Sequence, residues 1–164
     1  MLPNNLIAMK QVIFVCLGNV CRSPSAEAVF KAMVDKYGFQ SEFQCDSAGT
    51  DAYHVGDEAD YRMKQFAKKR GYRLTSISRR FEPHFDFDRF DLIIGMDKQN
   101  VRDLKAVARN ENDRKKISLM TDYCTHTKCD SVPDPYYGGA AGFELVLDIL
   151  EDACEGLIRK LQDK

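Results

Sequence analysis

The sequence lacks any long hydrophobic run and any large excess of charge. Nowhere do roughly eighteen apolar residues follow one another, so no segment is expected to cross a bilayer as a helix. The 164 residues include 24 Lys and Arg against 25 Asp and Glu, a formal net charge of -1. This balance argues against a nucleic-acid surface built on bulk positive charge, and we expect no nucleic-acid partner. Electrostatic recognition of a ligand must therefore be local.

Cysteine is also scarce, with six residues in a chain long enough to fold without disulfide staples. Reduced thiols and a cytoplasmic location are the expectation. Residues 1–10 lack the basic start and the apolar stretch of a secretory signal. We expect them to form a short N-terminal extension, followed by one domain over residues 11–164, because no repeat or linker divides the chain.

Short apolar segments alternate with amphipathic ones along the chain. The β-branched run from Val12 to Leu17 predicts a strand buried on both faces. Ser23 and Pro24 predict the N-cap and first residue of the next helix, and Gly38 predicts its end. Further strands are expected over residues 42–48, 91–96 and 116–120, and further helices over about 58–70, 99–109 and 146–161. This order predicts an α/β fold with a parallel sheet, which binds ligands at the carboxyl ends of its strands.

The first predicted strand ends in a candidate phosphate loop. Backbone N–H groups of such a turn, together with a helix N-terminus, form a cradle for an anion. Arg22 follows Cys16 by six residues, where its planar fork can grip two phosphate oxygens. The same positive field favours the thiolate of Cys16, the predicted nucleophile, and Ser23 could donate a hydrogen bond to that sulfur. The predicted phosphate-binding residues are Leu17, Gly18, Asn19, Val20, Cys21 and Arg22.

An isolated cysteine at the end of a strand is usually a buried structural residue. The spacing to Arg22, the Gly18-Asn19 turn and the helix start after it favour catalysis instead. Cys21 has two readings that the sequence leaves open. It is either a packing residue or the partner of Cys16 in a reversible disulfide that protects the nucleophile from over-oxidation.

Cleavage of an aryl phosphate also requires a proton for the departing oxygen. Asp134 is the best candidate for the general acid, because Pro133 and Pro135 stiffen the backbone on both sides of it. Tyr136 and Tyr137 follow and offer an aromatic wall. An aspartate between prolines is most often only part of a turn, so this assignment depends on the phosphate loop.

Taken together, these residues resemble the low molecular weight protein tyrosine phosphatase family. The matching motifs occur in order from Val12 to the final helix: Cys16 to Pro24, Asp46 to Thr50, Asp60-Tyr61-Arg62, Met96-Asp97 and Asp134 to Gly138. The resemblance implies a four-stranded parallel sheet with helices on both faces. It also implies a phosphocysteine on Cys16, with Asp134 protonating the phenol and then activating water. No metal and no cofactor are required.

The resemblance extends to supporting residues. It implies that Asn19 and Ser47 hold the phosphate loop through hydrogen bonds, with Asn19 in a left-handed conformation. Tyr53, Tyr136 and Tyr137 should line the substrate pocket and favour phosphotyrosine. Phosphotyrosine proteins are the implied partners of a protein that is expected to be a monomer, with weak dimerisation left open. Ser76 replaces a histidine that relatives carry in this network, which predicts a less rigid loop with a different pH response.

Three other readings remain. Arsenate reductases of similar fold relay oxidation through further cysteines, a role that Cys124 and Cys129 could take. A zinc site at Cys124, His126 and Cys129 lacks a second cluster of ligands. A phosphotyrosine reader without activity would need neither Cys16 nor Asp134. His54 and His84 are expected to be solvated loop residues.

Overall fold

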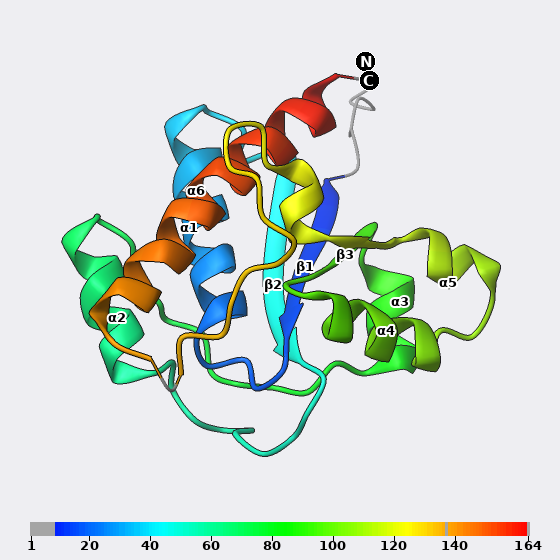
Figure 1. Ribbon diagram of the computed structural model, residues 1–164. Helices are drawn as coiled ribbons and strands as arrows, with labels where there is room; N and C mark the ends of the chain where they lie inside the picture. Colours follow the sequence, from blue (N-terminus) through cyan, green and yellow to red (C-terminus); the bar gives the residue numbers. More distant parts are fainter. Residues whose placement is uncertain (1–8, 137, 164) are drawn as a thin grey trace.

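The computed structural model describes residues 9–136 and 138–163, and its centre is one parallel sheet (Figure 1). Its strands are β1 (Lys10–Cys16), β2 (Phe43–Gly49), β3 (Leu92–Gly95) and β4 (Ile117–Leu119), in the spatial order β2-β1-β3-β4. All three strand pairs are parallel. The four-stranded parallel sheet predicted from the sequence is thereby confirmed. Residues 1–8 of the expected N-terminal extension lie outside the described residues.

Helices lie on both faces of this sheet (Figure 1). On one side lie α1 (Arg22–Lys36) and α6 (Ala140–Gln162), with α2 (Tyr61–Lys69) packed on α6. On the other side lie α3 (Pro83–Arg89), α4 (Lys98–Val107) and α5 (Glu111–Lys115). A 3-10 turn, η1 (Met120–Tyr123), follows β4. Among the described residues, none of the helices combines the length and the hydrophobicity that a membrane span requires.

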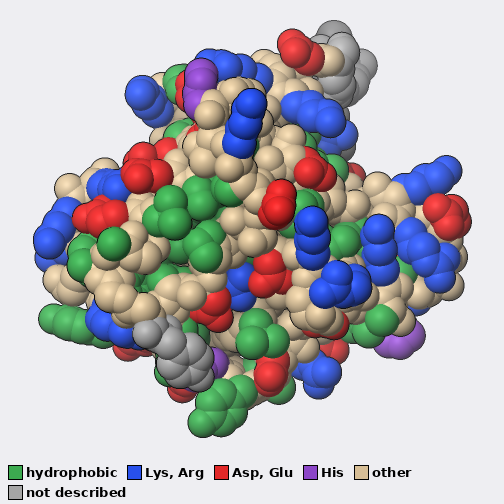
Figure 2. Space-filling model, viewed as in Figure 1, with side chains coloured by type: hydrophobic (Ala, Val, Ile, Leu, Met, Phe, Trp, Pro, Cys, Tyr) green, Lys and Arg blue, Asp and Glu red, His purple; other side chains and the backbone are tan. Residues whose placement is uncertain are grey.

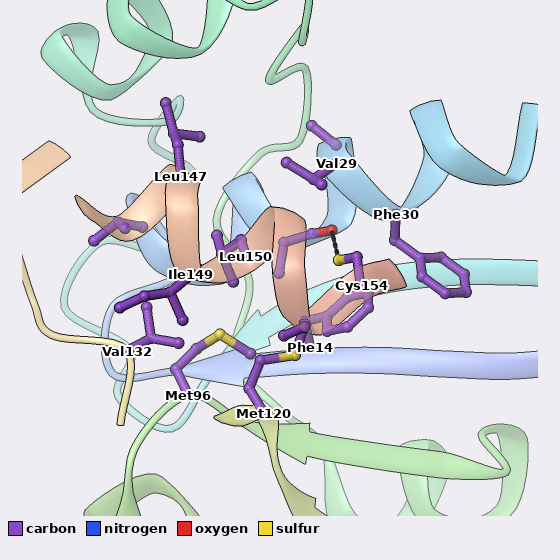
Figure 3. Close-up of a cluster of buried hydrophobic side chains, with 14 of the residues drawn as sticks. Phe14, Val29, Phe30, Met96, Met120, Val132, Leu147, Ile149, Leu150 and Cys154 are labelled. Atoms are coloured by element: carbon purple, nitrogen blue, oxygen red, sulfur yellow. Dashed lines mark hydrogen bonds between the residues drawn. The ribbon is translucent and has the colours of Figure 1, made fainter. Parts of the chain in front are cut away.

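Alternation along β1 creates two hydrophobic cores. Val12 and Phe14 face the core beneath α1 and α6, whereas Ile13 and Val15 face the core on the other side, and all four are fully buried. In Figure 3, Phe14 lies among side chains from α1, α6 and the loops that follow the strands. A central strand buried on both faces explains the uninterrupted apolar run in the sequence.

The structure differs from the predicted elements in three respects. The last helix begins at Ala140, ahead of the expected start at Val146. The short helices α3 and α5 were not expected, since each spans too few residues to show a helical period. The predicted N-cap at Ser23 is wrong. The helix begins at Arg22, with Cys21 in the cap position, because the hydroxyl of Ser23 is turned to the sulfur of Cys16. The predicted end at Gly38 is confirmed by its φ of 75°.

The carboxyl ends of β1 and β2 point to the lower end of the molecule in Figure 1. Three connections gather there: the loop from β1 to α1, the segment after β2, and the loop that leads into α6. Parallel strands therefore bring together residues from the first, second and last thirds of the chain.

Candidate active site

The phosphate loop fills the gap between β1 and α1 and places two hydrogen-bonding groups around one sulfur. Cys16 is 3% exposed, and its Sγ lies 3.0 Å from the hydroxyl of Ser23. The backbone N–H of Asn19 donates to the same sulfur over 3.3 Å. Donors on a sulfur stabilise its thiolate, so the loop is built to carry negative charge at this point.

Asn19 occupies the tight bend of the loop with a φ of 57°, the left-handed conformation expected from the sequence. Its amide nitrogen donates to Ser23 over 2.8 Å and to Ser47 on β2 over 3.0 Å. Its amide oxygen accepts from the N–H of Arg79 over 3.0 Å. One side chain therefore joins the loop, β2 and the segment before α3.

The structure corrects the expectation that Ser76 stands in this network. Ser78 is the serine that is buried against the loop, and its hydroxyl donates to the carbonyl oxygen of Gly18 over 2.9 Å. Ser47 donates to the buried carboxylate of Glu27 over 2.6 Å. Because Ser47, Ser23 and Arg79 satisfy the amide of Asn19, the network closes without a histidine.

Gly49 at the end of β2 permits a close approach of this strand to the phosphate loop. A Cβ atom there would lie 2.7 Å from the carbonyl oxygen of Leu17 and 3.2 Å from the backbone nitrogen of Asn19. Both contacts are to backbone atoms, which cannot turn away as a side chain would. Only glycine fits this position, which explains a residue that the sequence showed only as part of a family motif.

Arg22 at the start of α1 is held by groups from two other loops. Its Nη1 donates to Asp97 over 2.6 Å and to the carbonyl oxygen of Val132 over 3.2 Å. Burial works to lower the pKa of Arg22, but the negative charges of Cys16, Asp97 and Asp134 outweigh it and hold this pKa above its usual value. No role was predicted for Asp97, although its position between a buried strand and the start of α4 places it at the carboxyl edge of the sheet.

The loop before α6 brings Asp134 to the same place. Val132 is fully buried, and its N–H donates to the carbonyl oxygen of Met96 over 2.9 Å. Figure 3 shows Val132 beside Ile149 and Met96. The carboxylate of Asp134 lies 3.6 Å from Nη2 of Arg22, and 42% of the side chain is exposed. The loop therefore presents its carboxylate beside the guanidinium that follows the nucleophile.

These residues surround one cavity of about 250 Å³. The lining includes most of the predicted phosphate-binding and pocket residues: Cys16, Leu17, Gly18, Val20, Cys21, Arg22, Tyr53, Asp134 and Tyr136. Asn19, Ser23 and Ser47 do not line it and support the loop from behind. Tyr137 lies outside the described residues.

The expectation that His54 is a solvated loop residue is correct only in part: His54 lies in a turn, but only 21% of its side chain is exposed. His54 lines the cavity, its ring centre is 4.8 Å from that of Tyr53 and 5.9 Å from that of Tyr136, and Nδ1 lies 3.1 Å from a carboxylate oxygen of Asp57. Tyr53 is 83% exposed at the mouth. The fold of residues 50–60 brings His54 over the phosphate loop, where a Cβ on Gly18 would lie 3.0 Å from its ring.

The remaining cysteines do not form a second centre among the described residues. All six cysteines are free, and no group of three or more His, Cys, Asp or Glu side chains is placed to hold a metal ion there. Burial, together with the charge of Asp60, raises the pKa of the Cys21 thiol. Cys21 is therefore held as a neutral thiol beside Cys16.

At the end of the parallel sheet, a buried sulfur accepts from a backbone N–H, and an arginine and a carboxylate line the same cavity. These features define a cysteine-dependent phosphatase site. A family model described as low molecular weight phosphotyrosine protein phosphatase matches residues 11–164. The chain belongs to the low molecular weight phosphotyrosine protein phosphatase family, and it is an enzyme.

Relatives from distant organisms share almost the whole chain. A protein of Synechocystis whose name places it among these phosphatases is 48% identical over 92% of this chain and 96% of its own. The human low molecular weight phosphotyrosine protein phosphatase is 37% identical over 93% of this chain and 96% of its own. A crystal structure of protein tyrosine phosphatase from Entamoeba histolytica has a TM-score of 0.91 and 49% identity, and it covers 94% of this chain and 97% of that one.

Proposed function

We propose that the protein hydrolyses phosphotyrosine through a phosphocysteine on Cys16, with Arg22 binding the phosphoryl group and Asp134 as general acid and base. The observation that carries this proposal is the meeting of Cys16, Arg22 and Asp134 around one cavity. These residues come from two distant parts of the chain, and each supplies a function that the reaction needs.

In the first step, the thiolate of Cys16 attacks phosphorus while the bond to the phenolic oxygen breaks. Backbone N–H groups from Leu17 to Arg22 and the guanidinium of Arg22 bind the phosphoryl oxygens, whose charge they stabilise in the transition state. The protonated carboxyl of Asp134 gives its proton to the departing oxygen. The products are a neutral phenol and a phosphorylated Cys16.

In the second step, water attacks the phosphocysteine and the sulfur leaves as a thiolate. Asp134, now ionised, takes a proton from that water, which restores the acid for the next cycle. Ser23 and the N–H of Asn19 stabilise the departing sulfur, from distances of 3.0 Å and 3.3 Å. Phosphate and the starting enzyme result.

Selectivity for phosphotyrosine follows from the depth and walls of the cavity. Cys16 is nearly inaccessible, so a phosphate must reach it on a long arm, and the rings of Tyr53, His54 and Tyr136 flank the way in. A phenyl ring both spans this depth and stacks on the walls, whereas the short arm of phosphoserine does neither. Tyr137 stays a proposed pocket residue on the basis of the sequence.

The proposal extends to the setting of the enzyme. Phosphotyrosine proteins are its substrates, and a nucleophile that must stay a free thiol suits the cytoplasm. Residues 11–164 form a single phosphatase domain that acts as a monomer. Figure 2 shows basic and acidic side chains mixed over one face of the molecule, in keeping with the net charge of -1.

The test compares three proteins under reducing conditions with a phosphotyrosine peptide and an aryl phosphate. The wild type is expected to hydrolyse both. Cys16→Ser removes turnover but keeps phosphate binding, because the cradle is unchanged. Asp134→Ala lowers turnover of the peptide about 10²–10⁴-fold, the usual contribution of a general acid. A wild type without activity, or a Cys16→Ser variant that retains it, refutes the proposal.

A further inference from the structure

The start of α2 is fastened to the phosphate loop. Asp60 precedes the helix, and its N–H donates to the carbonyl oxygen of Val20 over 2.7 Å. Its carboxylate caps the helix by accepting from the N–H groups of Arg62 and Met63 over 2.8 Å and 3.2 Å. The first turn of α2 therefore cannot shift without moving the loop that carries Cys16.

From this anchored turn, Arg62 reaches the loop of the general acid. Its Nη2 donates to the backbone carbonyl oxygen of Tyr136 over 2.6 Å and to a carboxylate oxygen of Asp60 over 3.3 Å. The guanidinium also lies 4.9 Å from the ring centre of Phe143 and 5.7 Å from that of Tyr136. A planar fork with these partners has its orientation fixed from several sides.

Tyr136 connects Arg62 to the carboxylate that the reaction uses. The N–H of Tyr136 donates to Oδ1 of Asp134 over 3.0 Å, while its carbonyl oxygen accepts from Arg62. The backbone of one residue therefore holds the general acid on one side and is held by α2 on the other. Arg62 does not line the cavity, so it has no direct contact with a phosphate bound there.

We propose that Arg62 is a positioning residue that sets the place of Asp134 relative to the phosphate loop. The connection runs from Val20 through Asp60 and Arg62 to Tyr136, and it joins two loops that lie more than a hundred positions apart in the sequence. This inference rests on the proposed role of Asp134 as general acid. It assigns to the exposed face of α2 a part in proton transfer rather than in phosphate binding.

The test uses leaving groups of different basicity. Arg62→Gln is expected to lower kcat/KM for a phosphotyrosine peptide about tenfold, because a small displacement of a catalytic group is costly. For p-nitrophenyl phosphate, whose acidic phenol departs with little need of a proton, the loss stays below about threefold. A purely structural effect would lower both values by the same factor. Equal losses, or none, overturn the proposal.

Two further variants separate Arg62 from general effects of charge and stability. Arg73→Gln removes an exposed arginine just beyond α2 and is expected to leave both kcat/KM values unchanged. In an Asp134→Ala background, Arg62→Gln should cause no further loss with the peptide, since the group that it positions is absent. A multiplicative loss in the double variant also overturns the proposal. Activity of the wild type towards p-nitrophenyl phosphate tests the proposed function separately.

Discussion

At the scale of single residues, Asn19 has two roles that two substitutions can separate: its side chain makes hydrogen bonds, and its backbone adopts a left-handed conformation. Asn19→Ala removes its hydrogen bonds to Ser23, Ser47 and Arg79. It also places alanine, which tolerates the left-handed conformation less well than asparagine, at a φ of 57°. We expect the free energy of unfolding to fall by about 2–4 kcal/mol, measured by urea unfolding, with a loss of kcat/KM. Asn19→Gly keeps the backbone conformation and should lose about half as much stability. Equal losses of stability in Asn19→Ala and Asn19→Gly would show that the left-handed conformation adds no cost for alanine.

The second prediction at this scale concerns Cys21. If Cys21 closes a disulfide on an oxidised Cys16, peroxide inactivates the wild type reversibly, and dithiothreitol restores its activity. Cys21→Ser should instead lose activity permanently, because the sulfenic acid proceeds to a sulfinic acid. Closure of the disulfide is expected to be slow, since burial raises the pKa of Cys21 and little of it is present as the attacking thiolate. Recovered activity and intact mass measure both outcomes.

Cys129→Ser is the matched control, because Cys129 lies away from the cavity lining. It should recover as the wild type does. Full recovery of Cys21→Ser after peroxide would contradict the protective role and leave Cys21 as a packing residue.

Some roles of single residues can be predicted from a sequence and others cannot. Cys16 and Arg22 share one loop, so their spacing alone predicts their meeting. The prediction that Asp134 is the general acid depended on the chemical need for a proton donor. The positions of Asp97 and His54 in the site follow from how distant loops fold over the cradle, and no local pattern encodes them. Ser78 was missed for the same reason, since Ser76 lies only two positions away and the two are indistinguishable by type.

At the scale of elements, α6 fixes the segment that leads to the acid loop. The carboxylate of Asp152 accepts from the backbone N–H groups of Thr125, His126 and Thr127 over 2.6–3.3 Å. Although burial works to raise the pKa of Asp152, these hydrogen bonds hold it well below its usual value. Gly156, one turn further on, lets η1 approach α6, since a Cβ there would lie 1.9 Å from the carbonyl oxygen of Tyr123.

Asp152→Asn is expected to lower the free energy of unfolding by about 2 kcal/mol at pH 7, because an amide nitrogen would face several N–H donors. A depressed pKa in the folded protein contributes stability above the unfolded pKa of about 3.9, and this contribution disappears as pH falls towards the folded pKa. The difference in the free energy of unfolding between variant and wild type should therefore shrink below about pH 4. Urea unfolding over a range of pH measures it.

Asp148→Asn offers a control on the same helix, because this carboxylate is 63% exposed and pairs with Arg70 at the surface. We expect it to change the free energy of unfolding by less than about 0.5 kcal/mol. If the free energies of unfolding of Asp152→Asn and wild type differ by a constant amount from pH 7 to pH 3, the ionised carboxylate of Asp152 is not the source of the stabilisation.

The long elements were predictable and the short ones were not, for a physical reason. β1 and α6 display several periods of burial, so their apolar patterns stand out. α5 spans five residues and contributes only Asp113 to the interior, where Arg109 pairs with it. A helix held by caps and ion pairs leaves no hydrophobic period to detect.

At the scale of the whole molecule, the phosphate loop belongs to the core as much as to the site. Cys16, Val20 and Cys21 are part of the core beneath α1 and α6, while Asn19 binds β2 and the segment before α3. Phosphate bound to the loop should therefore stabilise the fold as a unit. Binding that is confined to the folded state adds about 2.7 kcal/mol at a ligand concentration of 100 times Kd.

For a chain of this length, that stabilisation corresponds to a rise in Tm of about 5–10 °C, measurable by scanning calorimetry. Cys16→Ser should show at least the same rise, because it keeps the cradle and removes the negative sulfur. Arg22→Ala should lose most of it, since Arg22 is the only Lys or Arg among the described residues that line the cavity. Phosphate also stabilises proteins in general by its exclusion from their surfaces, and Arg22→Ala measures that background directly. A rise of equal size in Arg22→Ala would mean that phosphate does not bind the loop.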